Sequence, residues 1–429
     1  MERKVCEMRV FTAELKRLLK TRSILILLLA ALLLAPVLAY FPASFASWTY
    51  KDDSGQEIRA EGKAALKLEA KNQGQFQGAI TEEILAAALT RYMDFAAGYE
   101  GGLPDGIYDE RVAAGDYYEK VANVDGLLSR VNEAWADPDT GLAPGLHNLT
   151  AEQVKGFYPQ CRQHLKDLLF LEGGANARTE NAVREAFILY DQVKMPFTYK
   201  PGLTSDAIEY VGIYVFLLVL ICTFILVPVF SSDSQTQADQ ILKYTRDGKK
   251  CLAVSRILAG LLLTGILYLV CMTLFLLLLN ASFDFKGLDT SLQLLVSVSV
   301  FLPLTAGQME LLIAGAGFVS LMATAAFTLF LSGQMKTVAS ASITAFVFLL
   351  LPVIVYMILS GNTGNWIRCL LPSGGVGLMN SFTYASMDTG FAYIGNTAIW
   401  LPYLMMGATA VDSFLFTALA GVNWCRREK

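Results

Sequence analysis

Long apolar runs alternate with polar segments along the chain, and their lengths predict a membrane protein. Six runs are about as long as a helix needs to cross a bilayer, which is roughly 20 residues. They are Ser23–Phe41, Ile208–Phe230, Leu252–Leu279, Leu311–Leu331, Val338–Ser360 and Asn396–Ala420. A seventh run, Ser291–Leu304, is shorter and is interrupted by Pro303, so we expect it to be re-entrant or interfacial rather than spanning.

Lys and Arg in the short flanks predict the orientation of these six spans, because they collect on the cytoplasmic side. Only Lys286 and Arg368 fall in the short loops on one side. Those on the other side are Arg3, Lys4, Arg9, Lys16, Arg17, Lys20, Arg22, Lys243, Arg246, Lys249, Lys250, Arg256, Lys336, Arg426, Arg427 and Lys429. We therefore predict six spans, both termini in the cytoplasm and a location in the plasma membrane, in a bacterial cell.

The charge distribution divides the chain further. Apolar residues make up 54% of the chain and charged residues 17%, which is below the share in a soluble domain. Acids nevertheless outnumber bases between residues 46 and 209, whereas bases outnumber acids in the rest. We predict an all-α polytopic protein with a cytoplasmic amphipathic helix (1–22), a first span (23–45), a mainly helical extracellular domain (46–207) and a five-span bundle (208–429).

Local patterns refine this division. Apolar residues at three- and four-residue steps between basic ones indicate that residues 2–22 form a helix in the inner membrane interface. In the external domain, breakers at 101–104, 137–141 and 173–174 predict about four helical units. Residues 361–395 mix aromatic residues with Pro and Gly, so we expect an extracellular re-entrant or interfacial segment.

The chain lacks the motifs of an enzyme. No G-x-x-x-x-G-K-[ST] or G-x-S-x-G sequence occurs, and the two histidines, His147 and His164, make only a weak metal set with Cys161. We expect no cofactor and no nucleic-acid partner. Among ionisable residues near membrane depth, Glu310 and Arg256 lie at span edges, where headgroup exposure is the simpler interpretation. Asp412 could bond a neighbouring helix, face a substrate path or mark a misplaced boundary.

The segment between the second and third spans carries the sharpest signal. Ser231, Ser232 or Asp233 could cap a short helix that runs through Ala238 and ends at Asp247-Gly248. Its apolar residues Ile241, Leu242 and Tyr244, with Lys243 and Arg246 at the rim, would form a small docking patch. A basic loop that only sets topology explains the charges but not these apolar residues.

This segment resembles the coupling segment of ABC-2-type transporter permeases. The shared pattern is Pro228-Val-Phe230, Asp233, Ile241-Leu242, Thr245, Gly248-Lys249 and Arg256, with Asp233 where the family usually has Glu and Arg256 where it usually has Lys. The interfacial first helix, the six spans and the Leu371-Pro-Ser hairpin also fit. The resemblance covers residues 1–45 and 208–429, while the external domain resembles no family we can name.

The resemblance implies the membrane-spanning subunit of an ATP-driven exporter, not an enzyme itself. Two such chains, identical or related, would pair in the lipid membrane and bind two copies of a separate ATPase. Residues 231–251 would form the main coupling segment, with a smaller contact around Gln334 and Lys336, and Asp412 and Glu310 are candidates for the translocation path. The alternatives are a membrane receptor or secretion accessory protein, similar to phage-infection-type proteins, and a membrane-embedded enzyme.

Overall fold

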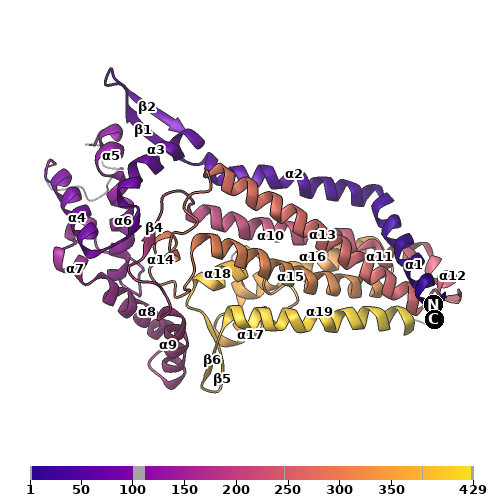
Figure 1. Cartoon of the computed structure of the whole chain (residues 1–429). Coiled ribbons are helices and arrows are strands. Elements are labelled where there is room, and N and C mark those ends of the chain that lie inside the picture. The colour runs from indigo at the N-terminus through magenta and orange to yellow at the C-terminus, as the bar shows by residue number, and fades with distance from the viewer. Residues whose placement is uncertain (1, 100–111, 246, 379, 427–429) are drawn as a thin grey trace.

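The computed structural model describes residues 2–99, 112–245, 247–378 and 380–426, with side chains from Met8 onward. Over these ranges the chain is predominantly helical, and six helices are long and apolar enough to cross a membrane. Both features confirm the prediction. The long helices form a bundle with a separate domain at one end, the domain end, whereas α1 and the last turns of α19 lie at the other, the terminal end (Figure 1).

The six long helices follow the predicted apolar runs closely. The second is one apolar stretch in two parts, α10 and α11, because Pro228 begins a new helix directly after Val227. An amphipathic helix, α1 (Glu2–Lys20), precedes them and packs against α13. The bounds are α2 (Arg22–Ser44), α10 (Ser205–Leu226), α11 (Pro228–Thr236), α13 (Lys250–Ser282), α15 (Ala306–Gln334), α16 (Val338–Ile358) and α19 (Leu401–Arg426).

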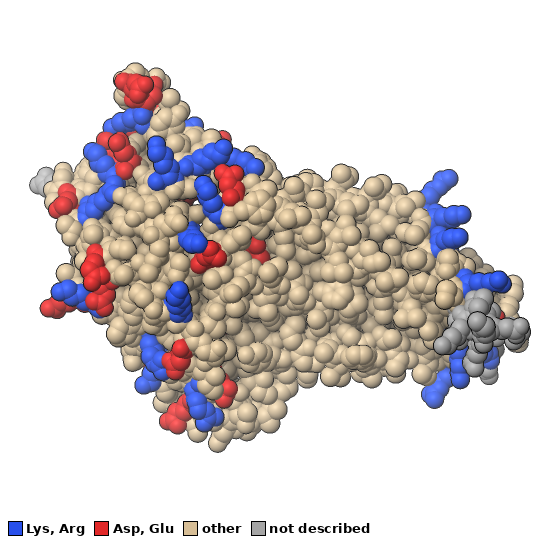
Figure 2. Space-filling view, viewed as in Figure 1, with Lys and Arg blue, Asp and Glu red and all other residues tan. Residues whose placement is uncertain are grey.

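Charged side chains gather at the two ends of the molecule and leave the middle of the bundle nearly free of them on the face shown in Figure 2. Inside the bundle, α15 packs along α10 and α19, while α2 packs against α10 and α13. An uncharged belt around helices of this length is what a lipid bilayer requires. The chain is therefore a multi-pass membrane protein by length and composition.

Residues 46–204, which we call the inserted domain, are mostly helical, with a core around Tyr92, Phe157 and Phe197. The sequence did not predict its hairpin, β1 (Ser47–Lys51) with β2 (Glu57–Glu61), nor the small pair β3 (Gly78–Ala79) with β4 (Thr198–Tyr199). The helices are α3 (Lys63–Gln73), α4 (Glu82–Ala96), α5 (Ala114–Lys120), α6 (Ala122–Asn132), α7 (Ala151–Lys155), α8 (Phe157–Gly173) and α9 (Ala177–Tyr190), with single 3-10 turns at Gly74–Phe76, Glu133–Trp135 and Leu146–Asn148.

Two of the three helix-breaking segments predicted for this domain can be compared with the structure. The one at 101–104 lies outside the described residues. At the other two, Gly141 and Gly174 adopt positive φ angles of 69° and 70°, and Gly174 ends α8.

Two connections between spans dock the inserted domain onto the bundle. The run predicted as re-entrant or interfacial does not span the bundle. It contains a short helix, α14 (Leu292–Leu295), followed by a turn and by irregular chain that is largely buried. Its Ser291 hydroxyl accepts a hydrogen bond from the backbone N–H of Thr198 at 2.9 Å. On the other side of the domain, Asn181 on α9 donates to the Asn396 carbonyl at 2.7 Å.

Most of the second connection, residues 361–395, folds into α17 (Gly361–Leu370), α18 (Phe382–Met387) and strand β5 (Phe391–Ile394). Strand β5 pairs with β6 (Thr397–Trp400) to form a hairpin. The predicted start of the sixth span at Asn396 is therefore wrong, since helix α19 begins only after this strand.

Candidate functional site

The predicted coupling segment forms a short helix, α12 (Ala238–Tyr244), at the terminal end. It does not begin at a cap on Ser231, Ser232 or Asp233, as the sequence suggested, because these residues lie inside α11. The break falls at Gln237, whose left-handed backbone (φ 59°) ends α11 and turns the chain into α12. Helix α12 is thus a separate unit beyond the long second helix.

Helix α12 presents two large apolar side chains to its surroundings. Ile241 is 74% exposed and Tyr244 is 94% exposed. Leu242, predicted to share this patch, instead packs partly buried against the main hydrophobic core. The exposed patch therefore consists of Ile241 and Tyr244, and Leu242 holds the helix to the bundle.

The predicted basic rim of the patch is also different. The Lys243 ammonium lies 4.6 Å from the centre of the Trp424 ring on α19 and 3.6 Å from an Asp239 carboxylate oxygen, so it faces the bundle. Arg246 lies outside the described residues. Of the other predicted coupling residues, Thr245 and Lys249 are exposed and Ala238 is partly buried.

Beneath α12 lies a set of four charged residues, Glu14, Arg17, Asp233 and Arg256, which we call the charge cluster. Arg256 on α13 is only 3% exposed and forms ion pairs with Asp233 of α11 and, at 3.3 Å, with Glu14 of α1. Arg17 pairs with Glu14 at 2.7 Å and with Asp233 at 3.8 Å. Two positive and two negative groups thus balance one another at the meeting point of three helices.

The charge cluster shows that one expectation was wrong, and it includes two site residues that the sequence did not reveal. Arg256 was expected to face lipid headgroups, yet it is buried. Glu14 and Arg17 were not identified as site residues, although an acid three positions before a base on one helix face is a recognisable ion-pair spacing. Their second partners, Asp233 and Arg256, are far away in sequence, so no local pattern could reveal them.

Trp424 near the end of α19 forms the floor between the cluster and α12. Its ring centre lies 5.2 Å from the Arg256 guanidinium, and the Phe230 ring lies 5.8 Å from the same group. The indole N–H donates to the Gly248 carbonyl at 3.0 Å. A Cβ at Gly248 would lie 1.6 Å from the Leu242 carbonyl oxygen, so the segment can close onto Trp424 only with glycine there.

The second predicted contact lies at the same end and is bonded to α11. The Ser332 hydroxyl near the end of α15 accepts hydrogen bonds from the backbone N–H groups of Phe230 and Ser231, both at 3.0 Å. Gln334 and Lys336, which follow it, are exposed. The two predicted coupling regions therefore share one end of the bundle and are joined by hydrogen bonds from backbone N–H groups to the Ser332 hydroxyl.

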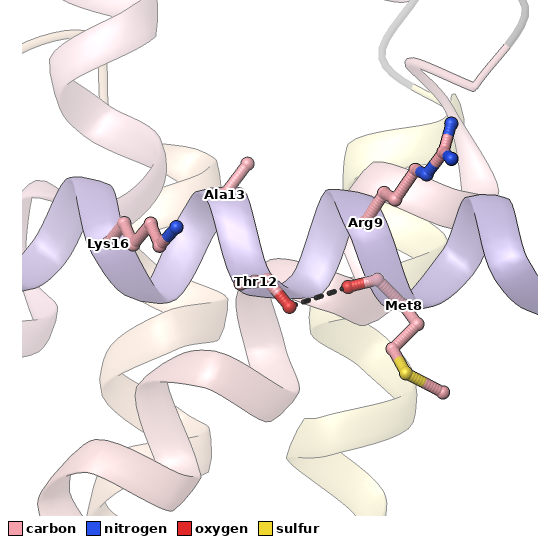
Figure 3. A pocket seen from close by; sticks show the side chains of 5 residues that line it. All are labelled: Met8, Arg9, Thr12, Ala13 and Lys16. Atoms are coloured by element: carbon pink, nitrogen blue, oxygen red, sulfur yellow. Dashed lines mark hydrogen bonds between the residues drawn. The ribbon is translucent and has the colours of Figure 1, made fainter.

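Helix α1 turns its opposite face outward at this end. Met8, Arg9, Thr12, Ala13 and Lys16 line an open depression with a volume of about 430 Å³. Figure 3 shows how these five side chains lie along α1. These five residues are exposed, whereas Glu14 is buried and Arg17 partly buried, so α1 combines residues bonded into the bundle with exposed basic ones. This division suits a helix that lies in the membrane interface, as predicted.

The two acidic residues proposed for a translocation path lie apart from this site. Glu310 is 3% exposed and accepts a hydrogen bond from the Asn280 amide of α13 at 2.9 Å, so its expected headgroup exposure is wrong. Asp412 on α19 is partly buried, and one of its carboxylate oxygens is buried without a hydrogen-bond partner among the described residues. The structure does not bring either residue to α12.

The described residues contain no group of three or more His, Cys, Asp and Glu side chains placed to hold a metal. Cys161 and His164 are buried in the inserted domain, whereas His147 is exposed, so the weak metal set is not assembled. Cys161 and Cys369 are free thiols. No protein-family model and no curated protein matches the chain.

Proposed function

We propose that the protein is the membrane-spanning subunit of an ABC-2-type exporter, driven by a separate ATPase that docks on α12. The observation that carries the proposal is the exposed pair Ile241 and Tyr244 on a helix held from behind by Trp424 and Leu242. An exposed apolar pair with an immobilised backbone suits insertion into a partner's groove. Six membrane-length helices and a balanced buried charge cluster below the patch agree with such a role.

The same structure suggests how force from the ATPase would reach the bundle. A push on α12 is transmitted to Trp424 on α19 and through the charge cluster to α1, α11 and α13. Ser332 adds α15 to this set. We propose that these helices move as one body and shift the bundle between two states.

A complete transporter needs a second membrane-spanning chain and two ATPase copies. Helices α2, α16 and α19 are the least buried of the six long helices, so they offer faces to a second chain or to lipid. Asp412 and Glu310 each keep one buried carboxylate oxygen without a hydrogen-bond partner among the described residues. For the substrate path, we propose Asp412 rather than Glu310, because the other oxygen of Glu310 is bonded to Asn280 within the bundle.

The test is an affinity pull-down of the tagged protein in mild detergent. The variant carries Ile241→Asp and Tyr244→Asp; the matched control carries Leu142→Asp and Ile188→Asp, which alter exposed apolar residues of the inserted domain. We expect wild type and control to recover an ATPase with Walker motifs and the variant to recover several-fold less.

Equal recovery with the variant would reject α12 as the main contact and favour the Gln334–Lys336 region. If the folded wild type recovers no ATPase in any nucleotide state, the exporter proposal fails and a receptor with a ligand-binding inserted domain becomes the better explanation.

A further inference from the structure

Two arginines, Arg256 and Arg368, are buried at opposite ends of the bundle, and they differ in whether a carboxylate pairs with them. Arg256 at the terminal end has carboxylate partners from two helices. Arg368 on α17, near the domain end, is 6% exposed and has no Asp or Glu within ion-pair distance among the described residues. A buried cation without a counter-charge is unfavourable, so this site needs a compensating group.

Arg368 touches only neutral groups among the residues that the structure describes. Its Nε donates to the Asn365 side-chain oxygen at 3.1 Å, and one terminal nitrogen makes a long contact of 3.5 Å with the Asn380 carbonyl. The guanidinium also lies 5.1 Å from the centre of the Tyr356 ring. These contacts orient the side chain without neutralising it, and they leave donor capacity on a planar group that matches an oxyanion.

Two residues beside Arg368 carry buried polar groups that lack hydrogen-bond partners among the described residues. Asn380 is 2% exposed, and neither its amide nitrogen nor its amide oxygen has a hydrogen-bond partner within the described part of the chain. The Ser381 side chain is 4% exposed, and its hydroxyl is likewise unpaired there. Since buried polar groups in proteins are nearly always bonded, two neighbouring exceptions beside an uncompensated charge indicate a missing partner.

The local fold keeps these groups together. The Phe382 N–H donates to the Gly375 carbonyl at 3.1 Å, which closes the chain between α17 and α18 into a compact loop. A Cβ at Gly377 would lie 2.3 Å from the Asn380 amide oxygen, so glycine there leaves room for the amide.

We propose that Arg368, Asn380 and Ser381 bind one anionic phosphate group. The guanidinium supplies the charge and paired N–H donors, while the amide and the hydroxyl supply further donors; this set is typical of oxyanion recognition. The phosphate belongs to a phospholipid headgroup or is free in solution. Ile367, Leu370 and Leu378 are exposed apolar residues around the site and would contact an acyl chain in the first case. The site does not depend on the proposed transport function.

The experiment measures phosphate binding in two forms. In one arm, the protein is released from phosphatidylcholine nanodiscs that either contain or lack phosphatidylglycerol. Native mass spectrometry then counts the phosphatidylglycerol molecules that the protein retains. In the other arm, the melting temperature in detergent is recorded with inorganic phosphate or chloride at equal ionic strength. Each arm uses wild type, Arg368→Gln and Asn380→Asp; the control, Arg178→Gln, removes an exposed arginine of the inserted domain.

Wild type and Arg178→Gln should retain phosphatidylglycerol or gain stability from phosphate, and Arg368→Gln should bind about tenfold more weakly or worse. Asn380→Asp tests the idea in a folded protein, because it gives Arg368 an internal carboxylate and should abolish binding without loss of stability. Retention of lipid alone assigns the site to a headgroup, and stabilisation by phosphate alone assigns it to the free ion. The proposal is overturned if wild type shows neither effect, or if both site variants bind as wild type does.

Discussion

His164 lies in the core of the inserted domain, on α8, where it is 5% exposed. Burial lowers the pKa of this imidazole below its ordinary value, while the nearby carboxylates Glu133 and Asp167 act in the opposite direction. The folded domain therefore holds His164 in its neutral form at neutral pH, and its stability depends on that form.

The sign of the pH effect follows from linkage. Because the folded pKa is lowered, the unfolded chain binds the proton more readily, and the stability that neutral His164 contributes is present above about pH 6.5. It is lost as the pH falls from there through the folded pKa. We expect the melting temperature of the domain to fall across this window, and that of His164→Gln to fall less over the same window.

The control for that experiment is His147→Gln, which removes the other histidine of the chain from an exposed position. It should melt with the pH profile of the wild type. An unchanged pH profile in His164→Gln would mean that other groups cause the acid sensitivity.

At the residue scale, the sequence predicted side chains correctly where the environment is local. Ile241 and Tyr244 are exposed as expected. The predictions failed where the partner is distant: Arg256 and Glu310 looked like edge residues because the acid and the amide that meet them belong to other helices.

At the scale of elements, the charge cluster joins three helices through charges that have little access to water. The side chains of Arg256 and Asp233 are 3% and 13% exposed. Removing one member of such a set leaves its former partners buried and unpaired. This lowers the free energy of unfolding more than replacing the whole set by apolar residues would.

We therefore expect Arg256→Met to cost about 3–5 kcal/mol of stability, measured by reversible unfolding in mixed detergent micelles. Adding Asp233→Asn should restore a substantial part, since it removes the carboxylate that Arg256 neutralised. The control, Arg184→Met, breaks an exposed pair with Glu185 and should cost about 0–1 kcal/mol. If both arginine variants cost the same, the cluster does not hold these helices together.

The long helices themselves were the most predictable elements, because a bilayer-length apolar run has few other structures available. Their ends were less predictable. The left-handed residue that ends α11 is Gln237, not a glycine that would mark the turn. Strand β6 lies at the start of the sixth predicted run, where its residues are as apolar as those of a helix. Hydropathy separates apolar from polar sequence but does not distinguish such a strand from a helical turn.

At the scale of the whole molecule, the sequence predicted a separate domain between the first two spans but not how it docks. Besides the side-chain bonds of Ser291 and Asn181, the domain meets the bundle through backbone contacts, such as the Leu203 N–H bond to the Lys286 carbonyl at 3.1 Å. Gly202 and Gly287 flank this bond, and a Cβ at Gly287 would lie 2.2 Å from the Leu203 nitrogen. The sequence shows where a glycine stands, but it does not show which distant backbone segment packs against it.

This contact predicts that Gly287→Ala loosens the domain from the bundle. The variant suffers a positive φ of 84° and a direct steric clash, whereas Gly55→Ala, in the turn of the β1–β2 hairpin, suffers a similar φ of 82° with open space around the new methyl group. We expect about 1 kcal/mol of destabilisation for Gly55→Ala and clearly more for Gly287→Ala. Limited proteolysis should release the inserted domain several-fold faster from Gly287→Ala, while equal rates in the two variants would show that the domain is held elsewhere.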